Sequence, residues 1–135
     1  MKRIILASVS AAALSLAAGS AFAQDQSTIT QNGNNGSANV TQNGTANESF
    51  IVQNLGGNGN AATVSQLGAN SDSTVTQSGA NGVANVQQRA SANGADSDIT
   101  QGPAGADHRA SVIQAGGAAD SDIVQTGSAN AAVYQ

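Results

Sequence analysis

The amino-acid sequence predicts an all-β fold: a flattened β-solenoid of five turns, with two strands in each turn and a cleaved signal peptide in front. Three repeating features predict it. A glutamine recurs along the chain, a β-branched aliphatic residue stands two positions before each glutamine, and Ser and Ala alternate four positions before it. Residues two apart share one face of a β-strand, and self-similarity at a fixed period is typical of stacked repeat units.

Residues 1–23 have the features of a secretory signal peptide. Lys2 and Arg3 precede an apolar run over residues 4–18, and a small-x-small cleavage site ends at Ala23. The apolar run is too short for a comfortable membrane span. We therefore predict export and cleavage after Ala23, with a retained membrane anchor as the alternative.

The chain beyond Ala23 is acidic and almost free of aromatic side chains. Its eight acidic residues face two basic ones, Arg89 and Arg109, because two of the four basic residues lie in the signal peptide; its net charge is therefore −6. An acidic chain without a basic patch is poorly suited to nucleic acid or anionic lipid. A composition rich in Gly, Ala, Ser, Asn and Gln is by itself typical of disorder. The order of the residues predicts regular structure instead.

The repeated glutamines recur at nearly even intervals, and each ends a predicted strand. They are Gln31, Gln42, Gln53, Gln66, Gln77, Gln88, Gln101, Gln114, Gln125 and Gln135. The aliphatic residues two positions earlier are Ile29, Val40, Ile51, Val64, Val75, Val86, Ile99, Val112, Ile123 and Val133. The small residues four positions earlier are Ser27, Ala38, Ser49, Ala62, Ser73, Ala84, Ser97, Ala110, Ser121 and Ala131.

A predicted strand that begins with the repeated Ser and the following strand that begins with the repeated Ala together make one repeat unit. Ser49 and Ser73 therefore hold the same position in successive units. After a short segment, 24–26, five such units occupy residues 27–135. Their approximate bounds are 27–46, 47–70, 71–94, 95–118 and 119–135. The residues between the strands are rich in Gly and Asn, which tolerate the positive φ of tight corners. We predict ten short strands joined by tight turns, with no helix after the signal peptide.

Stacking is needed because one repeat cannot bury its own face. Successive turns would lie about 4.8 Å apart, so that equivalent residues form columns as in cross-β amyloid. Each glutamine amide could then donate to the turn on one side and accept from the other, which satisfies a group that is costly to bury unpaired. The last repeat runs in register to Gln135. We therefore expect the exposed edges of the end turns to join other copies of the chain.

The repeat Ser-x-Ile-x-Gln-x-Gly-x-x-Asn-x-Ala-x-Val-x-Gln closely resembles the curlin repeat of bacterial curli fibres, over residues 27–135. The first unit carries it as Ser27, Ile29, Gln31, Gly33, Asn35, Ala38, Val40 and Gln42. Two departures stand out. Family members often have a Gly-rich targeting segment where this chain has only 24–26, and Gly105 and Ala119 replace the motif Asn in later turns.

The resemblance implies a secreted structural subunit of an extracellular, pilus-like amyloid fibre at the cell surface. It implies a role in biofilm matrix, adhesion and aggregation. The implied partners are further copies of the chain, a homologous subunit of the same fibre and an outer-membrane export pore, with host surface or matrix components as further candidates. A nucleator of this family tends to end in an atypical basic repeat. Residues 121–135 are regular and carry no positive charge, which favours the major subunit over the minor nucleator.

Four acidic residues late in the chain are candidate gatekeepers against aggregation. Asp98 and Asp122 hold the same position in successive repeat units, with Asp96 and Asp120 beside them. We expect these side chains to stack on the outer face, where like charges repel and slow association. A solvated, solubilising surface is the alternative. Asp107 belongs to the same acidic stretch.

No arrangement of residues indicates catalysis, a metal or another cofactor. His108 is the only histidine and has no Cys or second His with which to share a metal, so we interpret it as a residue at the edge of a turn. The Ser residues form a repetitive column without a general base. Pro103 cannot donate to a ladder and is expected in a corner, which makes the fourth repeat the least regular.

Two soluble solenoids are alternatives to the fibre subunit. The stretches before Ile99 and Ile123 faintly resemble the Gly-Asp nonapeptide of calcium-binding β-rolls, although the period differs and the first three repeats lack the acids. An ice-binding solenoid would need a flat ladder of Thr-x-Thr pairs. Only Thr28/Thr30 and Thr74/Thr76 provide such pairs.

Overall fold

The computed structural model describes residues 24–54, 58–104, 106–127 and 130–135, and these contain ten strands and no helix. The strands are β1 (Gln26–Gln31), β2 (Ser37–Gln42), β3 (Glu48–Gln53), β4 (Ala61–Gln66), β5 (Asp72–Gln77), β6 (Val83–Gln88), β7 (Asp96–Gln101), β8 (Arg109–Gln114), β9 (Asp120–Gln125) and β10 (Asn130–Tyr134). The predicted signal peptide over residues 1–23, and Gly105, lie outside the described residues.

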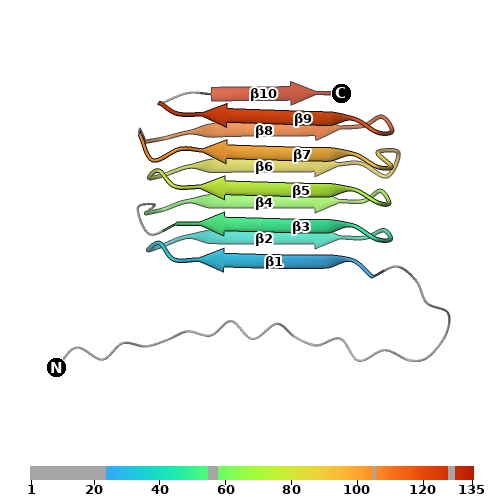
Figure 1. The fold of residues 1–135 in the computed structure, drawn as a ribbon, viewed down its shortest axis with the longest axis horizontal. Helices are drawn as coiled ribbons and strands as arrows, with labels where there is room; N and C mark the ends of the chain where they lie inside the picture. Colours follow the sequence, from blue (N-terminus) through green and yellow to red (C-terminus); the bar gives the residue numbers. More distant parts are fainter. Residues whose placement is uncertain (1–23, 55–57, 105, 128–129) are drawn as a thin grey trace.

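The strands form two parallel five-stranded sheets that face each other (Figure 1). The odd strands make one sheet, in the order β1-β3-β5-β7-β9, and the even strands make the other, in the order β10-β8-β6-β4-β2. The chain crosses from one sheet to the other at every turn, so it completes four circuits from β1 to β9 and adds a half-circuit to β10. The predicted all-β solenoid with two strands per turn is confirmed.

The pairing register is the same at every step. Each glutamine that ends a strand pairs with the glutamine that ends the next strand of its sheet, as Gln53 does with Gln77 and Gln77 with Gln101. A slip of one residue would turn the apolar side chains outward, so burial of one face pins this register. Equivalent residues therefore stand in columns along the solenoid axis.

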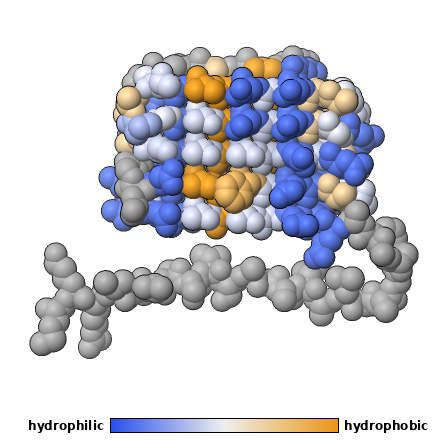
Figure 2. Space-filling model, viewed as in Figure 1, coloured by the Kyte–Doolittle hydropathy of each residue, from blue (hydrophilic) through white to orange (hydrophobic). Residues whose placement is uncertain are grey.

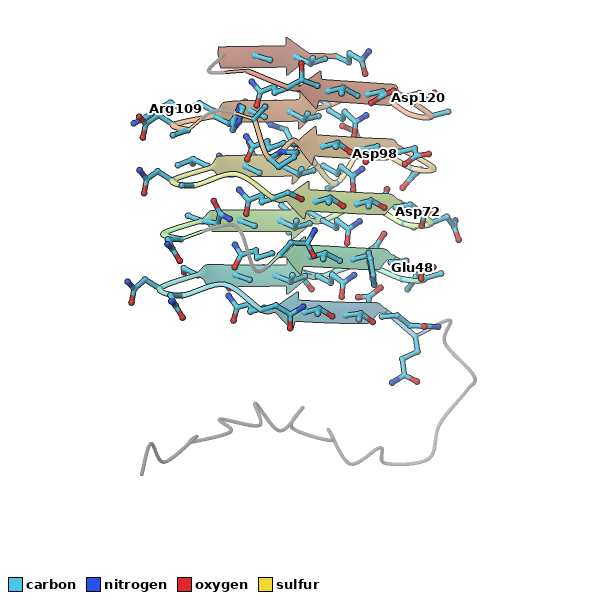
Figure 3. The ribbon with its side chains drawn as sticks, turned by 60° about the vertical axis from the view of Figure 1, so that its left-hand side comes forward. Glu48, Asp72, Asp98, Arg109 and Asp120 are labelled. Carbon is cyan, nitrogen blue, oxygen red and sulfur yellow. The ribbon has the colours of Figure 1, made fainter. Side chains whose placement is uncertain are left out.

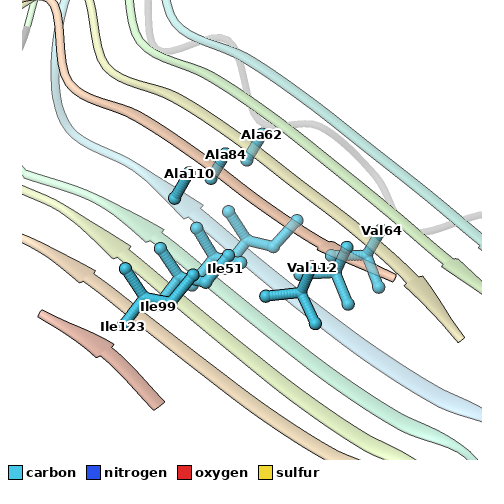
Figure 4. Packing of buried hydrophobic residues seen from close by; sticks show 10 residues of the cluster. Ile51, Ala62, Val64, Ala84, Ile99, Ala110, Val112 and Ile123 are labelled. Atoms are coloured by element: carbon cyan, nitrogen blue, oxygen red, sulfur yellow. The ribbon is translucent and has the colours of Figure 1, made fainter. Parts of the chain in front are cut away.

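The core lies between the two sheets (Figure 4). It is a column of Ile and Val from the odd strands, packed against a column of Val and a column of Ala from the even strands. The buried members are Ile51, Val75, Ile99 and Ile123 in the first column, Val64, Val86 and Val112 in the second, and Ala62, Ala84 and Ala110 in the third. β-Branched side chains suit these positions because their restricted χ1 matches the pleated strand.

Each described turn enters the next strand through a residue in the left-handed conformation, two positions before that strand. These residues are Asn35, Ala46, Gly59, Asn70, Asn81, Gly94, Asp107 and Ala118, with φ between 48° and 71°. Gly and Asn adopt this conformation readily. Ala46 and Ala118 do not, because an alanine at positive φ brings its Cβ against the following carbonyl oxygen.

Differences in repeat length are absorbed in the turns. The turns 54–60, 89–95 and 102–108 have seven residues where the shorter ones have five. Pro103 lies in the last of these, outside any strand. The neighbouring strands β7 and β8 nevertheless keep full register with β5 and β6. The irregularity expected of the fourth repeat is thus confined to its turn.

Replacement of a left-handed alanine by glycine should stabilise the solenoid. Ala46→Gly removes a Cβ clash of about 1–2 kcal/mol and adds about 0.5–1 kcal/mol of chain entropy cost, so we expect a net gain of up to about 1 kcal/mol. The midpoint of guanidinium denaturation measures it. Ala62→Gly, at a buried strand position, is the control and should lower the midpoint. A midpoint lowered equally by both changes would contradict the assignment of strain to Ala46.

Candidate functional site: glutamine ladders, acidic columns and open ends

The glutamines of the odd strands form a continuous ladder of side-chain amides along the corner of the solenoid. Each Nε2 donates to the Oε1 of the next glutamine at 2.9 Å. The ladder joins Gln31, Gln53, Gln77, Gln101 and Gln125. The amides also tie the two sheets together, since Gln77 Nε2 donates to the carbonyl oxygen of Ala61 in β4 at 3.0 Å. Fully buried amides are thus satisfied on both sides.

The ladder of the even strands is interrupted at two steps, after Gln66 and after Gln114. Gln42 donates to Gln66 at 2.8 Å and Gln88 donates to Gln114 at 2.9 Å. Gln66 Nε2 donates to the backbone oxygens of Glu48 and Ser71 instead, and within the described chain Gln88 Oε1 has no partner. The expectation that every glutamine bonds on both sides is wrong at these two steps. Gln114 Nε2, like that of Gln66, donates to two backbone oxygens, those of Asp96 and Ala119, and to no glutamine.

The ladders have a direction. In each of their hydrogen bonds the glutamine nearer the N-terminus donates and the one nearer the C-terminus accepts. The end formed by β1 and β2 therefore presents the Oε1 atoms of Gln31 and Gln42. The two ends of the solenoid differ chemically, as head and tail.

The β1 end is also the place where the core is open. Ile29 is 44% exposed, whereas Ile51, which pairs with it one layer along the axis, is 0% exposed. Strands β1 and β2 at one end, and β9 and β10 at the other, each have one edge without a partner strand in the described chain. Such edges are templates for pairing with another chain.

The serine column of the odd strands, which lies beside the glutamines of the even strands, carries an unexpected feature. Ser49, Ser73, Ser97 and Ser121 are buried, and none of their hydroxyls has a hydrogen-bond partner among the described residues. A buried hydroxyl without a partner is costly. The alternation of Ser and Ala was visible in the sequence, but the lack of partners depends on distances across the core that no sequence pattern reports.

Two columns of carboxylates run up the outer face of the odd-strand sheet (Figure 3). The first residue of each odd strand from β3 to β9 is acidic, and direct pairing stacks these four side chains: Glu48, Asp72, Asp96 and Asp120. Asp98 and Asp122 stack two positions further along their strands. The sequence pattern predicted Asp96, Asp98, Asp120 and Asp122 as gatekeepers but not Glu48 and Asp72, although each residue of the first column directly precedes a serine of the repeat. Asp107 lies in a turn, outside both columns.

The columns make their inner members harder to ionise. Burial raises the pKa of Asp96, and the neighbouring charges of Asp120 and Asp72 raise it further, against a lowering by the backbone N–H of Ser97. Burial likewise raises the pKa of Asp98, with added repulsion from Asp122 and Asp96. Like charges one layer apart repel, so the ionised columns oppose the stacking that the backbone requires.

His108 is the last residue of the turn before β8, at the edge of that turn as predicted, and its side chain is fully buried. Its backbone oxygen accepts from Val83 N at 2.7 Å, which sets it directly against Gly82 of the layer below. Neither ring nitrogen has a partner within the described ranges. Across those ranges no three His, Cys, Asp or Glu side chains are grouped to hold a metal.

The outer face of the odd strands lacks the ladder that an ice-binding solenoid needs. Pairing places Phe50 between Thr28 and Thr74, and Asp98 follows in the same column. The Thr-x-Thr pairs are therefore not contiguous.

Among the residues that the structure places, no helix has the length and apolar character to cross a membrane.

Comparison with protein families gives one match. The family model of the curlin associated repeat matches residues 56–79, a stretch that contains β4 and β5. No curated protein and no solved structure matches the chain significantly. The protein is thus a two-sheet β-solenoid in which one stretch is similar to the curlin associated repeat, and the other strand pairs follow the geometry of the matched one.

Loss of one ladder glutamine should be costly. Gln77→Leu leaves Gln101 Oε1 without its donor and takes from Gln53 Nε2 one of its acceptors, so we expect a loss of about 2–4 kcal/mol in the free energy of unfolding. Guanidinium denaturation measures it. Gln87→Leu, on the outer face of β6, is the matched control and should change stability by under about 0.5 kcal/mol. Equal effects at the two positions would rule out a special role for the ladder.

Acidification should stabilise the solenoid. Because the folded chain holds protons at Asp96 and Asp98 more tightly than the unfolded chain, the free energy of unfolding rises as pH falls from neutral through the raised pKa values toward about 4. Replacement of Asp96, Asp98, Asp120 and Asp122 by Asn should stabilise the chain at neutral pH, flatten this pH dependence and shorten the lag before self-association. Denaturation midpoints between neutral and mildly acidic pH, with light scattering for the lag, measure these effects. An unchanged lag would refute the gatekeeper role.

Proposed function

We propose that this protein is the major structural subunit of an extracellular, curli-like amyloid fibre, and that it polymerises end to end. The observation that carries the proposal is the open β1 end, where Ile29 is 44% exposed beside two unpaired strand edges. The match of residues 56–79 to the curlin associated repeat supports it, since curlin proteins serve structural rather than enzymatic roles.

The two ends of the chain are complementary. If β1 and β2 of one copy stack on β9 and β10 of another, Ile29 meets Ile123, Gln31 meets Gln125 and Ser27 meets Ser121. These pairs repeat those that already stack within the chain, as Ile99 does on Ile123 and Gln101 on Gln125. The junction would therefore be one more layer of the same solenoid.

Such a contact joins different surfaces of the two copies, head to tail, and so it does not close. A head-to-tail contact without closure generates a filament. In that filament the backbone edges are paired and Ile29 is covered, and the glutamine ladder runs through the junction in one direction. The growing fibre is therefore polar.

The major subunit is favoured over the minor nucleator by the C-terminal repeat. Strand β9 keeps full register with β7, and no basic residue follows Arg109. We further propose that residues 1–23 direct secretion, that residues 27–135 are the five fibre-forming repeats, and that an outer-membrane pore exports the chain. A homologous subunit would start the fibre on the cell surface, where the fibres form biofilm matrix.

Seeded growth tests the proposal. Purified residues 24–135 should show a lag in thioflavin T fluorescence that preformed seeds abolish. The fibres should give the two cross-β reflections, at about 4.7 Å and at about 10 Å. Ile29→Lys should slow elongation of wild-type seeds at least about tenfold, because it places an unpaired charge in the junction. Thr30→Lys, which points outward from the same strand, is the matched control. A chain that stays monomeric with seeds, or equal elongation by both variants, would overturn the proposal.

A further inference from the structure

The two outer faces of the solenoid differ sharply in charge. Outward side chains of the odd strands form what we call the acidic face, which holds six of the chain's eight carboxylates and no basic residue. The six are Glu48, Asp72, Asp96, Asp98, Asp120 and Asp122. Figure 2 shows this face, with hydrophilic columns beside a narrower column of Thr and Val. In a fibre both columns would extend along its whole length.

The opposite face, which we call the neutral face, carries no carboxylate on β2, β4, β6 or β8. Its central column is short and polar: Asn39, Thr63, Asn85 and Ser111. The column at the start of these strands is Ser37, Ala61, Val83 and Arg109, and the column near their ends is Thr41, Ser65, Gln87 and Ile113. Arg109 is the one charged side chain among these twelve, and it stands at the margin (Figure 3).

Charge decides which faces of neighbouring fibres can meet. Two acidic faces would bring twelve carboxylates per pair of chains together without a cation. A contact between the acidic face of one fibre and the neutral face of another also leaves carboxylates unpaired, if the axes of the two fibres point in the same direction. The odd and even strands point in opposite directions (Figure 1), so the column that starts with Glu48 would lie against the column that ends with Ile113, which holds no cation. Desolvation of unpaired carboxylates costs several kcal/mol each.

Two neutral faces avoid this cost. A two-fold axis parallel to the fibre runs the strands of the two copies in opposite directions across the contact, so the central column meets itself and Arg109 lies opposite the column of Ile113. Arg109 of one copy is then far from the Arg109 of the other. Short Asn, Thr and Ser side chains in register can interdigitate and hydrogen-bond between paired sheets.

We propose that the neutral face, formed by the outward side chains of β2, β4, β6 and β8, is the surface through which two fibres of this chain pair side by side. The partner is a second copy, bound through the same face. The acidic faces then point outward and keep the pairs in solution. This proposal rests on the proposed fibre, and it adds the lateral contact that the end-to-end junction does not supply.

Single cysteines can test the contact because the chain has none of its own. Thr63→Cys lies at the centre of the neutral face, and Thr74→Cys at the centre of the acidic face one strand later in the chain. Equivalent positions within one fibre recur every five layers, about 24 Å apart. A bismaleimide shorter than this repeat therefore joins chains only across a lateral contact. In seeded fibres at neutral pH, Thr63→Cys should give cross-linked dimers and Thr74→Cys should not.

Two further variants test whether the cross-linking yield depends on the charge of each face or only on how accessible the cysteine is. Asn85→Asp adds a carboxylate to the neutral face. Combined with Thr63→Cys, it should lower the yield of cross-linked dimers at least about fivefold without slowing seeded elongation. Replacement of the six acidic-face carboxylates by amides should allow Thr74→Cys to cross-link.

Three results would each overturn the lateral contact and leave the fibre intact. They are dimers from Thr74→Cys equal to those from Thr63→Cys, no dimers from Thr63→Cys in well-formed fibres, and no effect of Asn85→Asp on cross-linking. Failure to form fibres at all would overturn both proposals.

Discussion

Everything in this structure depends on the hydrogen bonds between parallel strands stacked in register, one layer apart. They place equivalent residues directly above one another, so the inward-facing side chains of the repeat contact side chains of the same or similar type in the next layer. Isoleucine covers isoleucine, and the amide of Gln53 finds that of Gln77 at hydrogen-bond distance. Glutamine suits this stack because it can donate on one side and accept on the other. A side chain that only donates or only accepts could not continue the ladder.

The same stacking has costs as well as benefits. A carboxylate at one repeated position becomes a column of carboxylates, as at Asp72 and Asp96, and the pKa of Asp96 rises in consequence. A chain selected only for stability would not keep such columns. Their placement on a single outer face supports the proposed roles of this repulsion, in slowing association and in directing which faces of two fibres meet.

Much of the fold could be predicted from the sequence, because the same alternation of inward and outward residues recurs in every repeat. The strand positions, the inward face and the two-sheet solenoid followed from the spacing of residues such as Ile51 and Gln53. The full acidic column could have been found from the repeat interval that separates Glu48 from Asp72. The complete burial of the His108 side chain could not be predicted, because it depends on how the neighbouring layers pack around the turn.

The strand period, the inward and outward faces and the order of the layers are encoded locally, because they follow from side-chain alternation and repeat length. How individual polar groups are satisfied depends on the packed layers. The break in the ladder at Gln88, the unpartnered hydroxyl of Ser97 and the exposure of Ile29 all depend on what lies across the core or in the next layer. Those distances arise from the stacking of the whole chain and are encoded in no single repeat.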